Sequence, residues 1–482
     1  MIHRERNTIM IIKDNVLIGL EENEIKLINY CGTIEFPNTV RSISDTAFSG
    51  NRGLTKIIIP ESVKNISNNA FFECTNLHNV IISDNCEVIG TSAFANCMFL
   101  YSITLPKNLK KISSSTFSNC EFLGNVIIPD EVEVIDVEAF KGCKRIKSIK
   151  IGKNVSEIDS SAFEYCGSIE KIIIEEDNKK YTSGNFNAIV DKETNTLIRG
   201  CINTDIPDTI DTIGDYAFSG TSGLSNITLG GNITTIGDYA FASCKDLVSI
   251  NIPDNVINIG TNAFINCESL NNIKLPNDYN LGFLPLLFKG CKSISNVEIS
   301  KNADVIYEEE FAGCESIKEI KIPESVRLIE ASAFRDCKSL TSIDIPPLVK
   351  EINADTFNGC SSLVNVTLSD RIESIGNCAF MSCASLEKIT LPKNLERIGR
   401  FAFSDCTLLK EINIPSSVSV IDDNTFLNCQ NLKKIFISKN TKIKSNAFYN
   451  CGGINLYTDA LEMPSEWKLP KNVNVVFGSA LD

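Results

Sequence analysis

A phenylalanine recurs every 23 residues along most of this 482-residue chain, and this period restricts the chain to very few folds. A cysteine follows most copies by three positions, as Cys74 follows Phe71. The series begins with Phe71, Phe94, Phe117, Phe140 and Phe163, and it resumes from Phe218 to Phe448. A side chain that every repeat requires is better suited to building the repeat than to reacting, so we interpret Cys74 as a packing residue. Stacked repeats share one core at any length, so the period predicts a solenoid.

Each repeat is expected to form one coil of that solenoid. In "GLTKIIIPESVKNISNNAFFEC", the spacing of Ile57 and Ile59 predicts a short strand with these two side chains inward. Lys56 and Ile58 are then expected to face outward, and the proline that follows ends the strand. The stretch "SVKNI" predicts a second short strand, and "SNNAF" predicts a single helical turn. One coil cannot bury both sides of its apolar row, so neighbouring coils must stack.

Repeats of the form L-x-x-I-x-I-P-x-x-V-x-x-I-x-x-x-A-F-x-x-C resemble the BspA-like subclass of leucine-rich repeats, over about residues 30–451. The resemblance implies a right-handed leucine-rich-repeat superhelix. It also implies a parallel β-sheet on the concave face, with short second strands and a single helical turn in each coil. Proteins of this subclass are associated with cell-surface display, adhesion to host or matrix proteins, and contacts between cells, so these roles are implied as well.

The repeat is interrupted once. Between Phe163 and Phe218 the step is 55 residues, about nine more than two coils need, and turns there separate apolar segments as in a β-hairpin. Trp467 follows the last repeat, and we interpret it as a plug for the last coil, with ligand stacking as the alternative. The predicted parts are an N-terminal hairpin cap (1–35), an N-terminal repeat block (36–174), a β-hairpin island (175–203), a C-terminal repeat block (204–451) and a C-terminal cap (452–482).

Fifteen of the nineteen cysteines occupy the position three after the repeated phenylalanine. Neighbouring strands lie about 4.8 Å apart, but side chains of such a row point the same way and do not face each other. We therefore expect free buried thiols, with a disulfide set or metal binding as alternatives. Free thiols are typical of a reducing or anaerobic compartment. Of the other four, Cys86 is expected in the core and Cys378 at the surface, whereas Cys31 and Cys201 fall in the cap and the island.

The sequence indicates no catalytic, cofactor or metal site. His3 and His78 are the two histidines, and neither has a recurring acid or nucleophile beside it. The acidic run from Glu175 to Asp177 is interpreted as a solvated charge cluster, with cation binding as the alternative. We therefore predict that the protein is not an enzyme and carries no cofactor.

Charge and hydropathy restrict the partners. The formal net charge of −14 disfavours non-specific binding to nucleic acid or anionic lipid. No apolar stretch is long enough to span a bilayer, and the apolar run "IMII" near the start is too short for a signal peptide. A cell-surface or extracellular location, implied by the resemblance, and a cytoplasmic one are therefore both kept open. We expect a monomer.

The outward side chains of the first strands remain as the candidate binding surface. In the N-terminal half they form an apolar row with polar residues beside it, which indicates either a contact surface or simple β-propensity. We expect a protein or other macromolecule to bind there and to the island, as an adhesion partner or, alternatively, as the partner of an intracellular scaffold. The candidate partner-binding residues are Lys56, Ile58, Ile81, Thr104, Ile127, Lys150, Lys171, Ile173, Tyr181 and Asn185.

Overall fold

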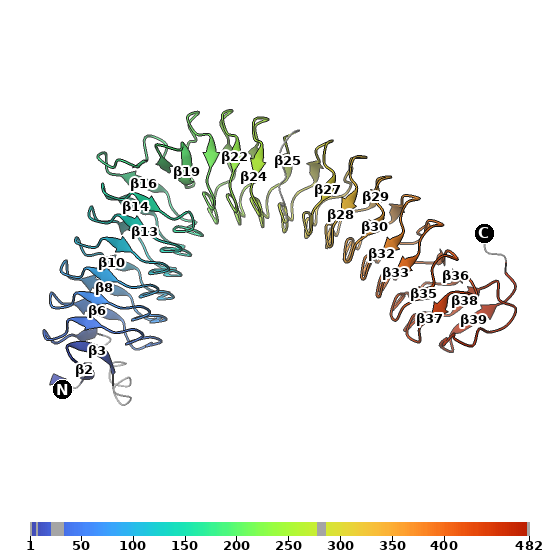
Figure 1. Cartoon of the computed structure of the whole chain (residues 1–482), viewed down its shortest axis with the longest axis horizontal. Coiled ribbons are helices and arrows are strands. Elements are labelled where there is room, and N and C mark those ends of the chain that lie inside the picture. The colour runs from blue at the N-terminus through green and yellow to red at the C-terminus, as the bar shows by residue number, and fades with distance from the viewer. Residues whose placement is uncertain (1, 6–7, 21–32, 277–285, 480–482) are drawn as a thin grey trace. The chain divides into compact units, whose positions relative to one another are not determined.

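The computed structural model describes residues 2–5, 8–20, 33–276 and 286–479, and it forms a parallel β-solenoid (Figure 1). The chain divides into two compact units. Unit 1 comprises Met1–Leu224 and Gly230–Cys244, and unit 2 comprises Ser225–Leu229 and Lys245–Asp482. Each unit is a stack of coils, which confirms the solenoid expected from the 23-residue period.

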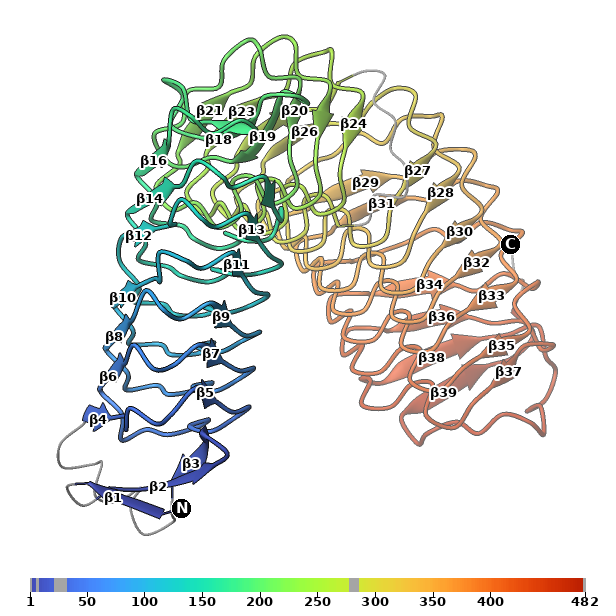
Figure 2. The same cartoon turned by 60° about the vertical axis from the view of Figure 1, so that its left-hand side comes forward.

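Coils of unit 1 contribute strands to two columns, which Figure 2 shows side by side. We call the strand that comes first along a coil its first strand, and the strand in the other column its second strand. Strands of one column pair in parallel with a shift of one repeat, so that Ile57 lies beside Val80 and Ile58 beside Ile81. The first strands are β4 (Thr33–Glu35), β6 (Lys56–Ile59), β8 (Asn79–Ile82), β10 (Ser102–Thr104), β12 (Val126–Ile127), β14 (Ser148–Ile151) and β16 (Lys171–Ile174). The second strands are β5 (Ser42–Ile43), β7 (Asn65–Ile66), β9 (Val88–Ile89), β11 (Lys111–Ile112), β13 (Val134–Ile135), β15 (Glu157–Ile158), β20 (Thr212–Ile213) and β22 (Thr235–Ile236).

Antiparallel strands occur in unit 1 at the start of the chain and at the repeat interruption. The first group is β1 (Ile2–Glu5), β2 (Thr8–Lys13) and β3 (Val16–Leu20), and the second is β17 (Tyr181–Thr182), β18 (Ile189–Asp191) and β19 (Thr196–Arg199). β3 pairs in parallel with β5, and β19 pairs in parallel with β20. Each group therefore joins the column of second strands. Cys31 lies outside the described residues, as does the rest of 21–32 in the expected N-terminal cap.

Unit 2 repeats the same two-column arrangement. Its first strands are β21 (Asn226–Thr228), β23 (Ser249–Asn251), β25 (Asn272–Lys274), β26 (Asn296–Glu298), β29 (Ser342–Asp344), β31 (Asn365–Thr367), β34 (Glu411–Asn413) and β36 (Lys434–Phe436), followed by β38 (Ile454–Tyr457) and β39 (Val473–Val476). Its second strands are β24 (Asn258–Ile259), β27 (Val305–Ile306), β28 (Leu328–Ile329), β30 (Glu351–Ile352), β32 (Ser374–Ile375), β33 (Arg397–Ile398), β35 (Val420–Ile421) and β37 (Lys442–Ile443).

The structure corrects the expectation of a helical turn in each coil. Throughout the described ranges the segment around the repeated phenylalanine consists of tight turns, with no helix assigned. Asn69 and Glu73, which flank Phe71, have φ values of 54° and 58°, and a right-handed helix excludes such left-handed residues. The N–H of Phe71 donates to the carbonyl of Ala93 in the next coil at 2.8 Å, and not to a carbonyl of its own turn. Hydrogen bonding between coils thus replaces hydrogen bonding within a helix.

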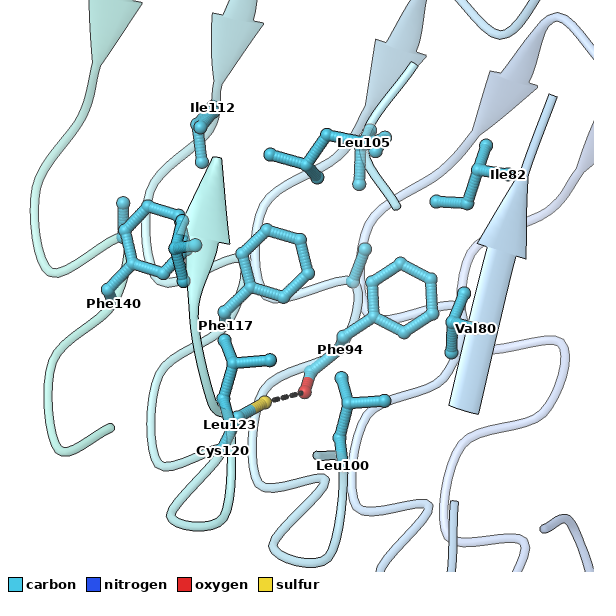
Figure 3. Packing of buried hydrophobic residues seen from close by; sticks show 14 of the residues in the cluster. Val80, Ile82, Phe94, Leu100, Leu105, Ile112, Phe117, Cys120, Leu123 and Phe140 are labelled. Carbon is cyan, nitrogen blue, oxygen red and sulfur yellow. Dashed lines mark hydrogen bonds between the residues drawn. The ribbon is translucent and has the colours of Figure 1, made fainter. Parts of the chain in front are cut away.

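The rows of phenylalanine and cysteine form the core, as expected. Consecutive rings stack with nearly parallel planes, as Phe94 and Phe117 do at a centroid separation of 5.8 Å (Figure 3). Thiols of the repeated cysteine row donate to the carbonyl of a phenylalanine in the preceding coil, and the Sγ of Cys120 lies 3.2 Å from the oxygen of Phe94. The cysteine therefore satisfies a buried acceptor while filling space, which is the packing role inferred for Cys74.

Trp467 closes the hydrophobic interior after the last repeat. Its side chain is buried, and its indole N–H donates to the carbonyl of Thr441 at 2.8 Å. A buried indole with a satisfied donor is unavailable for stacking on a ligand. The structure therefore favours the plug over the alternative of ligand stacking.

Candidate functional site

The first strands of unit 1 alternate buried and exposed side chains. In β6, Ile57 and Ile59 are buried, whereas Lys56 and Ile58 are exposed. The pairing of β6 with β8 places Ile58 beside Ile81. Outward side chains of successive coils therefore form rows along the stack, because the strands pair in register.

One of these rows is rich in isoleucine. Ile58 is 44% exposed, Ile81 41%, Ile127 65% and Ile173 37%. We call these four residues the isoleucine row. Thr104 is exposed beside Ile81, and Lys150 lies between Ile127 and Ile173. Large apolar side chains at this exposure are not needed for the core, which the inward side of the same strands supplies.

Three lysines accompany the isoleucine row. The ammonium group of Lys150 lies 2.6 Å from a carboxylate oxygen of Glu175, and this hydrogen bond raises the pKa of Lys150. Lys56 and Lys171 are exposed and form no ion pair within the part of the chain that the structure describes. The outward face thus presents apolar groups with cations beside them.

The island contributes one of its two expected contact residues. Asn185 is exposed, but Tyr181 is buried at 5% exposure. The hydroxyl of Tyr181 accepts from the N–H of Ile158 at 3.1 Å, so this side chain fastens the island to the preceding coil. Tyr181 cannot contact a partner, and we remove it from the candidate surface.

The island also covers β16, which is the final strand in the column of first strands of unit 1. The side-chain amide of Asn187 accepts from the N–H of Ile172 and donates to the carbonyl of Glu170, both at 2.8 Å. It therefore bonds to β16 as the backbone of a neighbouring strand would. The hydroxyl of Ser183 accepts from the N–H of Ile174 in the same way. An edge strand protected by side chains is a poor template for unwanted strand pairing.

Arg199 is an important residue that the sequence reasoning missed. It is 2% exposed, and its guanidinium donates to the carbonyls of Cys166, Tyr216 and Ser219 at 3.0–3.2 Å. Burial lowers the pKa of Arg199. The signal in the sequence is a charged residue directly after the apolar run "TLI" in the island. The role is structural, because Arg199 bonds to backbone carbonyls on both sides of the repeat interruption.

Burial makes the thiols of Cys74 and Cys86 poorly reactive. Burial raises the pKa of Cys74 to about 12 and that of Cys86 to about 11, so neither is a thiolate near neutral pH. Cys378 is half-buried, in keeping with its expected position near the surface, and Cys201 is buried. Among the described residues no three His, Cys, Asp or Glu side chains are grouped to hold a metal ion. Helices long and apolar enough to cross a bilayer are likewise absent from the described ranges.

A second exposed apolar feature lies next to the isoleucine row. Phe99 and Tyr101 are 41% and 54% exposed, and they immediately precede β10. The ring of Phe99 contacts that of Phe122 in the next coil, with centroids 5.1 Å apart. The sequence signal was available, since most repeats carry Ser or Asn where Phe99 and Phe122 stand. The isoleucine pattern alone did not reveal that these rings form one patch.

Comparison with protein families identifies the repeat. A family model described as "BspA type Leucine rich repeat region (6 copies)" matches residues 26–141, 112–201, 199–282, 285–380 and 328–455. These matches cover most of the chain. None of the curated proteins matches the sequence.

Several solved structures are similar to the chain. One is a leucine-rich repeat protein from Bacteroides ovatus ATCC 8483, with 28% identity over 92% of this chain and 96% of that chain and a TM-score of 0.44. A leucine rich cell surface protein from Faecalibacterium prausnitzii A2-165 has 27% identity over 76% of this chain and 94% of that chain, with a TM-score of 0.49. A leucine-rich repeat protein from Eubacterium ventriosum ATCC 27560 has 22% identity over 83% and 92% of the two chains, with a TM-score of 0.48.

Proposed function

Because the chain belongs to the BspA-type leucine-rich repeat family, we propose that it is a non-enzymatic protein that binds another macromolecule. The binding surface is the outward face of the first strands of unit 1. Repeat solenoids display an extended surface over many coils and commonly use it to bind other proteins. Function still has to be argued from the site, because one fold serves many functions.

The isoleucine row is the observation that carries this proposal. Ile58, Ile81 and Ile127 are each more than 40% exposed on a face whose core side is already filled. Exposed apolar groups gathered on one face with polar residues around them, as Thr104 and Lys150 are here, are typical of contact surfaces on soluble proteins. In unit 2 the corresponding outward residues include Lys274, Glu298 and Asp344, all exposed. The row of exposed isoleucines is therefore a property of unit 1 and not of the repeat.

The specific biological role that we propose is adhesion or cell contact at a cell surface. This part of the proposal rests on the roles that are associated with BspA-like proteins. A second candidate, an intracellular interaction scaffold, is supported by the row of buried free thiols, because reducing compartments keep thiols unpaired. Fractionation of the native cells, with detection of the protein by antibody, separates the two. Recovery in the cytosol alone would contradict the adhesion role and leave the binding role intact.

The binding surface itself is tested by substitution. The purified chain is used to capture partners from the extracellular material around the native cells. The captured partner is then purified, and its binding to the chain is measured by titration. We expect Ile81→Asp with Ile127→Asp to weaken this binding at least tenfold, about 1.4 kcal/mol, with nearly unchanged thermal unfolding. The matched control is Lys321→Glu with Asp344→Lys in unit 2. A larger loss in the control pair would place the site in unit 2 and overturn the proposal.

A further inference from the structure

An exposed aromatic patch lies on adjacent coils of unit 1. It consists of Met98, Phe99, Tyr101, Phe122 and Arg145, which we call the aromatic patch. Met98 is 39% exposed, and Phe99 and Tyr101 are more exposed still. The guanidinium carbon of Arg145 lies 3.9 Å from the centroid of the Phe122 ring. His78 borders the patch, with its ring 5.5 Å from that of Tyr101.

The fold does not require aromatic residues at these positions. Phe99 and Phe122 stand two residues after the repeated cysteine, and most other coils carry a small polar residue there. Examples are Asn76, Ser269, Ser293, Ser316, Ser339, Ser362, Ser385 and Asn431. Partly exposed rings at a position that other coils fill with Ser or Asn leave apolar surface in water without adding to the core. Such surface is typical of a contact site.

The aromatic patch lies just before the strands that carry the isoleucine row, with Ser102 between Tyr101 and Thr104. Tyr101 directly precedes β10, and β10 pairs with β8, which carries Ile81. Tyr, Met and Arg are enriched where protein interfaces concentrate their binding energy. The two features therefore belong to one surface. Its aliphatic groups lie on the strands, and its aromatic groups lie just before the strands begin.

Charge on this surface is opposite to that of the whole chain. The formal net charge is −14, yet none of the outward residues of β6, β8, β10, β12, β14 and β16 is acidic. Lys56, Lys150 and Lys171 lie among them. Near the aromatic patch, Glu121 is already paired with Lys144 at 2.7 Å, which leaves the guanidinium of Arg145 as the exposed charge on the rings. Acidic residues occur at the two ends of this surface, since Glu35 pairs in register with Ile58 and Glu175 forms an ion pair with Lys150. The six first strands from β6 to β16 carry only lysines as charged outward residues, and such a surface on an acidic protein is complementary to an anionic partner.

We propose that the aromatic patch and the isoleucine row together bind an extended protein segment that carries acidic and apolar side chains. This inference rests on the proposed function and names the chemistry of the partner. The isoleucine row spans five coil steps from Ile58 to Ile173, about 24 Å at the strand spacing, which is the length of about seven extended residues. A narrow row of this length fits one extended segment.

The geometry of the Phe99 and Phe122 rings argues against a sugar or a nucleic-acid base as their ligand. Both recognise aromatic side chains by stacking on open ring faces. The rings of Phe99 and Phe122 contact each other with a tilt of 50°, and the guanidinium of Arg145 lies over the ring of Phe122. The side chain of Met98 is 39% exposed, and a flexible thioether suits contact with the side chains of a protein.

The experiment uses the full chain and a library of phage-displayed random peptides of about twelve residues, long enough to cover the row. We expect the enriched peptides to carry net negative charge and several apolar residues, and their binding to weaken with added salt. In fluorescence anisotropy with the best synthetic peptide, Phe99→Ser with Tyr101→Ser should weaken binding at least tenfold. The matched control is Leu408→Ser, which removes a side chain of the same 41% exposure at the position of Phe99 in a coil of unit 2. This control should leave binding unchanged.

The outcomes separate the two proposals. Enrichment of basic or uncharged peptides, absence of enrichment, or tighter binding of heparin than of the acidic peptides would overturn the assignment of the partner. Loss of peptide binding in Ile81→Asp with Ile127→Asp but not in Phe99→Ser with Tyr101→Ser would leave the proposed function standing and contradict the role of the aromatic patch. Peptide binding that neither pair alters would contradict both. Thermal unfolding of each variant shows that the chain remains folded.

Discussion

The first strands of units 1 and 2 share their inward side and differ on their outward side. In both units the inward residues are buried aliphatics, such as Ile149 in β14 and Ile343 in β29. From β6 to β16 in unit 1 the outward residues are isoleucine, lysine and small polar residues, whereas those of unit 2 include exposed acids such as Glu298 and Asp344. The repeat therefore constrains only the side of the strand that contacts the core. Differences between the units on the other side are free to serve binding.

The largest expected effect tests whether the interiors of the two units are equivalent. Phe94 in unit 1 and Phe264 in unit 2 are both fully buried. Substitution of either by alanine should lower the free energy of unfolding by about 3–5 kcal/mol, because each deletes a core ring and leaves a cavity. Denaturant unfolding monitored by circular dichroism measures both. A loss of less than about 1 kcal/mol in one unit only would show that the interiors are not equivalent.

Arg199 tests a feature that belongs to the island of unit 1. Arg199→Ala removes a donor to three carbonyls; that of Tyr216 still accepts from the N–H of Ser219, whereas those of Cys166 and Ser219 lose the guanidinium. We expect a loss of about 3–4 kcal/mol in the free energy of unfolding, since unsatisfied buried groups retain their desolvation cost. Arg145→Ala, at an exposed arginine of the same unit, is the control and should cost under about 0.5 kcal/mol. Equal losses in the two variants would contradict the structural role of Arg199.

Glu310 is a place where the interior of unit 2 differs from that of unit 1. It occupies the position before the repeated phenylalanine, where the coils of unit 1 have Ala or Thr, as at Ala139. Burial raises the pKa of Glu310 from 4.5 to about 7. The native chain therefore keeps this proton up to about pH 7, whereas the unfolded chain loses it near pH 4.5. Stability should thus fall as pH rises across this window, by up to about 3 kcal/mol.

A comparison with Glu310→Gln isolates this contribution from other titrating groups. Glutamine keeps an oxygen that can accept from the N–H of Tyr307, as Oε2 of Glu310 does at 2.9 Å, but it does not ionise. We expect the two proteins to have similar stability at pH 5 and the Gln variant to be more stable at pH 8. Urea unfolding at both pH values measures the difference. Parallel pH dependence of the two proteins would show that Glu310 is not buried as described.

The smallest expected effect concerns thiol access. Among the described cysteines, Cys378 and Cys451 are half-buried and both lie in unit 2, whereas those of unit 1 are buried. Labelling of the native chain with a thiol reagent should therefore modify these two before the cysteines of the core row, and labelling at Cys378 should change stability by under about 0.5 kcal/mol. Peptide mapping by mass spectrometry identifies the labelled sites. Early labelling of Cys120 would mean that the row in unit 1 is accessible.

Much of the fold could be predicted because each side chain of one coil meets its counterpart in the next. The 23-residue period is the displacement between paired strands, so Ile57 beside Val80 follows directly from the sequence pattern. The candidate site was predicted in part. The exposure of Ile58, Ile81 and Ile127 followed from strand alternation, but the burial of Tyr181 did not, because it depends on how the island folds back onto the preceding coil.

The sequence by itself thus determined the period, the inward rows and the solenoid, since these depend on one pattern repeated at a constant spacing. Only the tertiary structure decided what happens where that pattern is broken. Tight turns take the place of the expected helical turn because the backbone there bonds to the next coil, as the N–H of Phe71 does to the carbonyl of Ala93. The role of Arg199 depends on carbonyls up to 33 residues away. Such features depend on contacts between different coils at positions that do not repeat, and a period contains no information about them.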